Sequence, residues 1–152
     1  MTLQGRREES MKLLQDSLEL IGRLSERIGV DVSLEIMEKI PKEFVTDAQS
    51  MKEAAGSRKN QFFYTLDIAH CDSEEEPFHI LDQLKRISKI HISNRKGGCY
   101  HTPLGNGDFS FKEMLPKLLA YGLPLVTEGY DDSRDFHRFM ENTVFLKTNG
   151  GL

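Results

Sequence analysis

Four acidic or imidazole side chains stand at the ends of four apolar segments of this 152-residue sequence. They are Glu35, Asp67, His91 and Glu128. Together they make a mixed oxygen and nitrogen ligand set, which suits Mn²⁺, Mg²⁺, Co²⁺ or Zn²⁺. A charged group at the end of an apolar strand is costly unless it is paired or bound to a metal. The four positions therefore predict one divalent-metal site, provided that the fold brings them together.

Each of these residues also has an ordinary structural explanation. Glu35 and Glu128 could be surface charges at strand ends, Asp67 could cap the turn that follows it, and most isolated histidines such as His91 bind no metal. The recurrence of such residues at the same place in four successive segments favours a shared site over four separate coincidences.

The elements that must position these residues follow from the apolar pattern. Apolar residues recur every three or four positions over residues 6–28, which predicts an amphipathic helix that ends at Gly29. Four strands are expected at 30–37, 61–70, 87–93 and 123–127, and helices at 46–55, 74–87, 109–121 and 133–146. The buried side of the last helix is expected to carry Phe136, Phe139, Met140, Val144 and Phe145.

Strands that alternate with helices imply a parallel sheet with right-handed crossovers. The carboxyl ends of parallel strands meet at one edge, where α/β enzymes and barrels keep their active sites. No linker divides the chain, so residues 1–152 are expected to form one domain. Periodicity alone leaves open whether the four units make a small doubly wound sheet or part of a barrel.

Motifs at the strand ends point to the barrel. They are Leu34-Glu35, Asp67-x-x-His70, His91-x-x-Asn94, the run from His101 to Phe109 (HTPLGNGDF), and Leu125-Val126-Thr127-Glu128. This series resembles the sugar phosphate isomerase/epimerase branch of the xylose isomerase-like and endonuclease IV-like TIM-barrel superfamily. The resemblance runs from about residue 20 to residue 129. It implies a half barrel, with helix four followed by the βα units five to eight of a (β/α)₈ barrel.

The resemblance also implies roles for the four strand-end residues. Glu35, Asp67, His91 and Glu128 would bind one divalent metal, and Glu35 and Glu128 would also serve as the two acid/base groups. The implied activity is that of an isomerase or epimerase acting on a small sugar, polyol or sugar phosphate. Such a reaction removes a proton next to a carbonyl and passes through an enediolate, which a divalent cation stabilises.

Three further residues are expected to contact the substrate by the same resemblance, namely His70, Arg95 and His101. Asn94, Asn106 and Asp108 are expected to shape loops through side-chain-to-backbone hydrogen bonds, and Asn94 could also support a metal ligand.

Two other functions remain open on the sequence. One is an endonuclease IV-like phosphodiesterase acting at abasic sites, in whose relatives an Asp-x-His pair binds further zinc. Here Cys99 replaces the aspartate, two residues before His101. Cysteine can ligate zinc, so a second metal is conceivable. The other is a half barrel that binds metal without catalysis. The net charge of −4 and the pI near 5.7 make a nucleic-acid partner the less favoured expectation.

The overall composition is that of a globular protein, with 38% hydrophobic and 29% charged residues. No apolar run approaches the roughly 20 residues needed to cross a bilayer. The polar N-terminus and two cysteines, Cys71 and Cys99, favour a cytoplasmic location.

A four-stranded half barrel would have two open edges, so we expect a second copy, or a partner that supplies the first half, to cover them.

Overall fold

Four parallel strands form the main sheet, in the order β1-β2-β3-β6. They are β1 (Ser33–Glu35), β2 (Phe63–Asp67), β3 (Ile87–Ile92) and β6 (Leu125–Thr127). The computed structural model describes residues 3–131 and 133–150, and for residues 3–5 only the backbone. Each strand is followed by a helix, and the parallel pairing confirms the predicted α/β fold.

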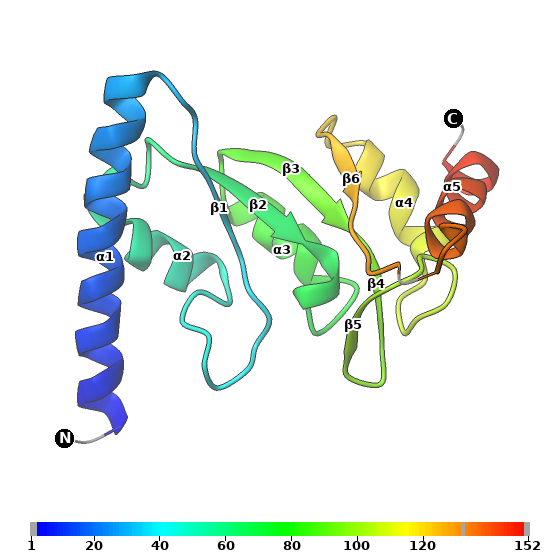
Figure 1. Ribbon diagram of the computed structural model, residues 1–152, viewed down its shortest axis with the longest axis horizontal. Coiled ribbons are helices and arrows are strands. Elements are labelled where there is room, and N and C mark those ends of the chain that lie inside the picture. The colour runs from blue at the N-terminus through cyan, green and yellow to red at the C-terminus, as the bar shows by residue number, and fades with distance from the viewer. Residues whose placement is uncertain (1–2, 132, 151–152) are drawn as a thin grey trace.

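Five helices accompany the sheet in the described residues (Figure 1). The long helix α1 (Leu3–Ile28) lies at one end of the molecule and α5 (His137–Asn149) at the other. Between them are α2 (Ala48–Ala55), α3 (Glu76–Gln83) and α4 (Phe111–Leu119), with a short 3₁₀ turn η1 (Gly56–Arg58) after α2. The core lies between these helices and the sheet, where Leu66 and Ile90 are fully buried. Among the described residues, no helix is long and apolar enough to span a membrane.

Several strands and helices are shorter than predicted. Strand β1 has three residues rather than the eight predicted at 30–37, and within residues 3–131 and 133–150 it has a neighbouring strand on one side only. Helix α3 ends at Gln83 rather than residue 87, because Leu84 is extended and leads the chain into β3. The prediction of a strand to residue 70 was also wrong. After Asp67 the chain turns into the 3₁₀ helix η2 (Ile68–His70), where the Asp67 carboxylate accepts a hydrogen bond from the Ala69 backbone N–H at 2.7 Å.

A hairpin that was not predicted follows β3. Its strands are β4 (Asn94–Lys96) and β5 (Cys99–Thr102), paired antiparallel. The turn consists of Gly97 and Gly98, whose φ angles are 54° and 85°. Two successive residues with positive φ suit the tight turn of a two-residue hairpin, and glycine adopts that conformation without a Cβ penalty. The hairpin carries His101 back towards the end of β2.

The prediction that the apolar side of the last helix is buried was wrong. In α5, the residues Phe139 and Met140 are 56% and 52% exposed, Val144 is 60% exposed, and Phe136, which precedes the helix, is 64% exposed. Of the five residues that were expected on the buried side, only Phe145 packs against the core. The helix has an apolar side as predicted, but among the described residues no element covers it.

Candidate metal centre

The structure brings the four strand-end residues together. Glu35 ends β1, Asp67 ends β2, His91 is the last but one residue of β3, and Glu128 follows β6. Each offers a ligand atom, and these atoms all lie within 4.8 Å of one another. Neighbouring strands are about 4.8 Å apart, so the outer two of four strands in a flat sheet would be roughly 14 Å apart. The closeness of the Glu35 and Glu128 ligand atoms therefore requires both side chains to reach inwards towards Asp67 and His91, as they would on the concave side of a curved sheet.

His91 lies at the centre of this group. Its Nδ1 atom is 2.5 Å from Glu128 Oε2, 3.6 Å from Glu35 Oε1 and 3.9 Å from Asp67 Oδ2. Four buried side-chain atoms among the described residues lack a hydrogen-bond partner, and three of them are Asp67 Oδ2, His91 Nδ1 and Glu128 Oε2. Buried polar atoms are nearly always hydrogen-bonded in native proteins. Their concentration at one point fits a cation with oxygen and nitrogen ligands.

The electrostatics of the four strand-end side chains also favour a bound cation. Burial, with a smaller contribution from the nearby charges of Glu128 and Glu35, raises the pKa of Asp67 to about 7. His70 and the hydrogen bond from Ala69 act in the opposite direction but do not cancel the effect. Three carboxylates so close together repel one another, and a divalent cation would remove that repulsion. The residues present fit such an ion, although their role as ligands stays a prediction.

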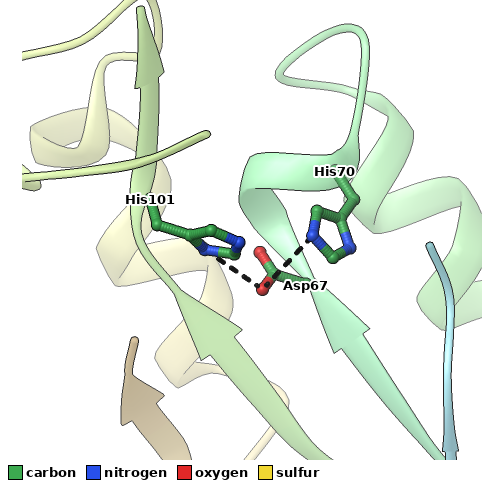
Figure 2. A group of neighbouring side chains, drawn as sticks. All are labelled: Asp67, His70 and His101. Atoms are coloured by element: carbon green, nitrogen blue, oxygen red, sulfur yellow. Dashed lines mark ion pairs between the residues drawn. The ribbon is translucent and has the colours of Figure 1, made fainter. Parts of the chain in front are cut away.

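Asp67 also belongs to a second group, with His70 and His101 (Figure 2). Figure 2 shows the two imidazoles on either side of the Asp67 carboxylate, His70 from η2 and His101 from β5. The Oδ2 atom of Asp67 is 3.7 Å from His101 Nδ1 and 4.0 Å from His70 Nε2. The two histidine rings meet edge to face with centroids 5.3 Å apart. Cys99 is exposed and is not part of either group.

Backbone and hydroxyl contacts orient the two histidines. His70 is buried, and its Nδ1 atom lies 2.8 Å from the carbonyl oxygen of Ile36. His101 Nδ1 lies 3.1 Å from the hydroxyl of Ser93. His101 has a φ of 60°, a conformation uncommon for residues other than glycine. The hairpin thus aims His101 at the site that the parallel strands form.

Arg95, the third predicted substrate contact, is held at the rim of the site. Its Nη1 atom donates to the carbonyl oxygen of Cys71 at 2.5 Å and lies 3.4 Å from Asp72 Oδ1. Its guanidinium carbon is 5.3 Å from the centre of the Tyr100 ring. These contacts position Arg95, whose role towards a substrate stays a prediction.

The structure adds one acidic residue that the sequence analysis missed. Glu38 Oε2 lies 3.7 Å from His70 Nε2, and its side chain is largely buried. Glu38 follows Glu35 by three residues, just beyond the end of β1. An acidic residue immediately after a strand that ends in a candidate ligand was a signal available in the sequence.

Asn94 supports the hairpin and the loop over residues 103–109, as predicted. Its side-chain amide donates to the carbonyl oxygens of Leu104 and Phe109 at 2.9 Å and 2.8 Å. Its carbonyl oxygen accepts from the backbone N–H groups of Arg95 and Phe109. Asp108 accepts a hydrogen bond from the backbone N–H of Gly97, which also confirms its predicted loop role. The Asn106 side chain instead accepts a hydrogen bond from the Lys96 side chain at 2.7 Å.

Comparison with known proteins gives a family and two related folds. Residues 2–144 match the family model AP_endonuc_2, described as a xylose isomerase-like TIM barrel. No curated protein matches the sequence. A D-tagatose 3-epimerase-like protein superimposes with a TM-score of 0.76 and 22% sequence identity, over 93% of this chain and 56% of that chain.

The second structure is the 3-keto-D-glucoside 4-epimerase YcjR from E. coli, in its apo form. It gives a TM-score of 0.72 and 18% identity, over 93% of this chain and 55% of that chain. The present chain therefore spans a little over half the length of each of these two structures, which fits a partial barrel. At sequence identities of 22% and 18%, this structural similarity establishes the fold alone.

Proposed function

The chain belongs to the xylose isomerase-like TIM-barrel family, and we propose that it forms the metal-binding part of a sugar isomerase or epimerase. The observation that carries the proposal is the convergence of Glu35, Asp67, His91 and Glu128 at the carboxyl edge of the parallel sheet. Three of their ligand atoms are buried without a hydrogen-bond partner. One structural relative is a D-tagatose 3-epimerase-like protein and the other is a 3-keto-D-glucoside 4-epimerase, and this supports a carbohydrate substrate.

The four residues would hold one divalent cation, which supplies positive charge opposite the oxygens of an enediolate. Glu35 and Glu128 stand on the two outer strands of the sheet, on either side of Asp67 and His91. A substrate bound between the two glutamates presents one face to each of them. One carboxylate then accepts the proton next to the carbonyl, and the other returns a proton from the opposite side.

His70 and His101 are assigned to the substrate oxygens. Both imidazoles face the Asp67 carboxylate beside the candidate metal position (Figure 2). An imidazole can donate or accept a hydrogen bond according to its tautomer, which suits a sugar hydroxyl. The Ile36 carbonyl accepts a hydrogen bond from the protonated Nδ1 of His70, which leaves Nε2 of the neutral ring as an acceptor.

The proposal is tested by solvent deuterium exchange. The purified chain is loaded with Mn²⁺ and incubated in D₂O with a panel of ketoses and ketose phosphates. We expect incorporation of deuterium at the carbon next to the carbonyl, and no incorporation with the Glu128→Gln variant. Metal binding without exchange over the whole panel, both for the chain alone and for the chain combined with a protein part that completes the barrel, would count against the isomerase.

A phosphodiesterase is the second candidate, because the Asp67, His70 and His101 group lies next to the first four ligands. A second cation there would suit a reaction in which two metals stabilise the attacking and leaving oxygens of a phosphate. Cleavage of an oligonucleotide with an abasic site, without deuterium exchange into sugars, would favour this candidate. Neither activity in a folded, metal-loaded sample would favour a metal-binding barrel part without catalysis.

A further inference from the structure

A cavity of about 350 Å³ lies at the amino edge of the parallel sheet. Its walls come from α2, from the connection between η1 and β2, and from the connection between α3 and β3. Four of the residues that line it are cations, namely Lys52, Lys59, Lys85 and Arg86. We refer to it as the basic cavity.

The basic cavity is well separated from the candidate metal centre. Tyr64, which also lines it, is the second residue of β2, and Arg86 directly precedes β3. His91 follows Arg86 by five residues, which corresponds to roughly 16 Å along a strand. Barrel enzymes keep their catalytic groups at the carboxyl edge, so a site at the amino edge lies outside the catalytic centre.

The charges around the basic cavity have one sign. None of the described residues that line it is acidic. Among the side chains that the structure describes, no carboxylate forms an ion pair with any of its four cations. The neighbouring Arg58, by contrast, pairs with Glu19 and Glu26. Four unpaired cations at one place stand out in a chain whose net charge is −4.

The ends of two helices explain part of this charge. Lys52 lies in the last turn of α2, and Lys85 follows the end of α3 by two residues. The carboxyl end of a helix carries a partial charge of about −0.5, so two helix ends offset about one of the four positive charges. About three positive charges remain, and their mutual repulsion is relieved when an anion binds between them.

Arg86 is held in place before any ligand binds. Its Nε and Nη2 atoms donate to the carbonyl oxygens of Phe62 and Gln61 at 3.1 Å and 3.3 Å. Its guanidinium carbon lies 4.3 Å from the centre of the Phe63 ring. A guanidinium has five N–H donors, so these two bonds leave donors for a ligand. A fixed arginine of this kind suits the oxygens of a phosphate group.

The size and lining of the basic cavity indicate a small ligand. Small-molecule sites have volumes of about 300–1,000 Å³, and this cavity lies at the lower end of that range. Tyr64 and Leu84 are buried and line it, so part of the surface is suited to an organic group. The exposed Glu53 and Asp82, which adjoin lining residues in the sequence, would repel a long chain of phosphates.

We propose that the basic cavity binds a phosphorylated small molecule. The phosphate groups lie among the ammonium groups of Lys52, Lys59 and Lys85 and accept hydrogen bonds from Arg86. The organic part of the ligand packs against Tyr64 and Leu84. Binding requires neither a metal nor turnover, so it can succeed or fail independently of the isomerase activity.

The test uses inorganic pyrophosphate as the ligand, on the chain after removal of divalent metals. Calorimetric titration measures the affinity, and NMR spectra of the ¹⁵N-labelled chain show which backbone amides respond. We expect saturable binding of one pyrophosphate per chain, with amide shifts at Lys59 and Arg86. Added salt should weaken the binding, because it screens the attraction between charges. A single-stranded oligonucleotide is titrated in parallel.

Two double variants make the test specific. Lys59→Gln combined with Lys85→Gln removes two exposed charges, so the chain should still fold, and pyrophosphate affinity should fall at least about tenfold. The matched control combines Lys112→Gln with Lys147→Gln, at exposed positions on α4 and α5 outside the basic cavity. It removes the same charge and should change the affinity much less.

Four outcomes would overturn the proposal. Equal losses in the two double variants would show a diffuse attraction to the whole surface. Amide shifts confined to the candidate metal centre would place the anion elsewhere. An oligonucleotide that binds more tightly than pyrophosphate would indicate a nucleic-acid surface, and the absence of saturable binding would exclude the site.

Discussion

The Nδ1 atom of His91 lies 2.5 Å from the Oε2 atom of Glu128, yet neither atom has a hydrogen-bond partner of acceptable geometry. The two residues come from neighbouring strands, β3 and the end of β6, and both side chains point into the same site. Asp67 Oδ2 is buried beside them and is also without a hydrogen bond. Two acceptors and an imidazole nitrogen that face one another in this way are suited to share a cation.

Loss of a ligand should abolish tight metal binding. We expect calorimetric titration to show binding of Mn²⁺ to the unmodified chain. Removal of outer-shell partners typically costs 10–100-fold in affinity, so Asp67→Asn and His91→Ala should each cost at least about 100-fold. His137→Ala is the control, because His137 is exposed at the start of α5 and should leave binding unchanged. Equal affinities for His91→Ala and the unmodified chain would contradict the proposed ligand set.

Metal binding should strengthen as the pH rises through neutrality. The pKa of Asp67 in the metal-free protein is about 7 and its carboxyl must lose a proton to bind a cation. The apparent affinity for Mn²⁺ should therefore fall by up to about tenfold per pH unit below 7 and level off above it. Titrations at several pH values between 5.5 and 8 measure this dependence. An affinity that does not vary over this range would contradict it.

The same carboxyl should make the metal-free protein less stable at higher pH. Its pKa is about 7 in the folded protein and 3.8 in its ordinary state, so the folded protein binds more protons between these values. The free energy of unfolding should therefore fall as the pH rises from 4 to 7. Thermal unfolding without metal should give a lower Tm at pH 8 than at pH 5.5, and Mn²⁺ should restore it. The Asp67→Asn variant should lose this part of the pH dependence.

Asn94 should be essential for stability, although it is not a predicted ligand. Its buried side chain makes four hydrogen bonds with the backbone of the hairpin and the 103–109 loop. Asn94→Ala leaves several buried backbone groups without partners, which should cost about 3 kcal/mol or more. Asn106→Ala, at an exposed position with one contact to Lys96, should cost about 0.5 kcal/mol or less. Urea unfolding measures both, and similar costs would contradict the assigned role.

Gly107 should tolerate no side chain, because it packs directly against Asn94. A Cβ atom there would lie 2.1 Å from the Asn94 side chain and 2.6 Å from the backbone oxygen of Arg95. Gly107→Ala should therefore cost about 1–3 kcal/mol in the free energy of unfolding. Gly129→Ala is the matched control, because the nearest atom to a Cβ there is 3.7 Å away. A Gly107→Ala variant as stable as Gly129→Ala would show that the loop can move without cost.

Several parts of this protein were predictable from the sequence, because they depend on local patterns. The alternation of strands and helices predicted the parallel sheet. In such a sheet the strands run the same way, so the residues at their carboxyl ends meet at one edge. The sequence by itself therefore determined that Glu35, Asp67, His91 and Glu128 stand at one edge of the sheet, in the order of their strands, whereas the tertiary structure brings the ligand atoms of the outer two together. It also indicated the loop role of Asn94.

Other features were decided by the tertiary structure. The Gly97-Gly98 turn brings His101 to within 3.7 Å of Asp67, and this depends on a hairpin that no apolar pattern marked. The contact between Glu38 and His70 joins residues that are 32 positions apart in the sequence, one after β1 and the other after β2. The exposure of Phe139 in α5 could not be read from periodicity either. A pattern shows which side of a helix is apolar, but only the arrangement of the other elements decides whether anything covers it.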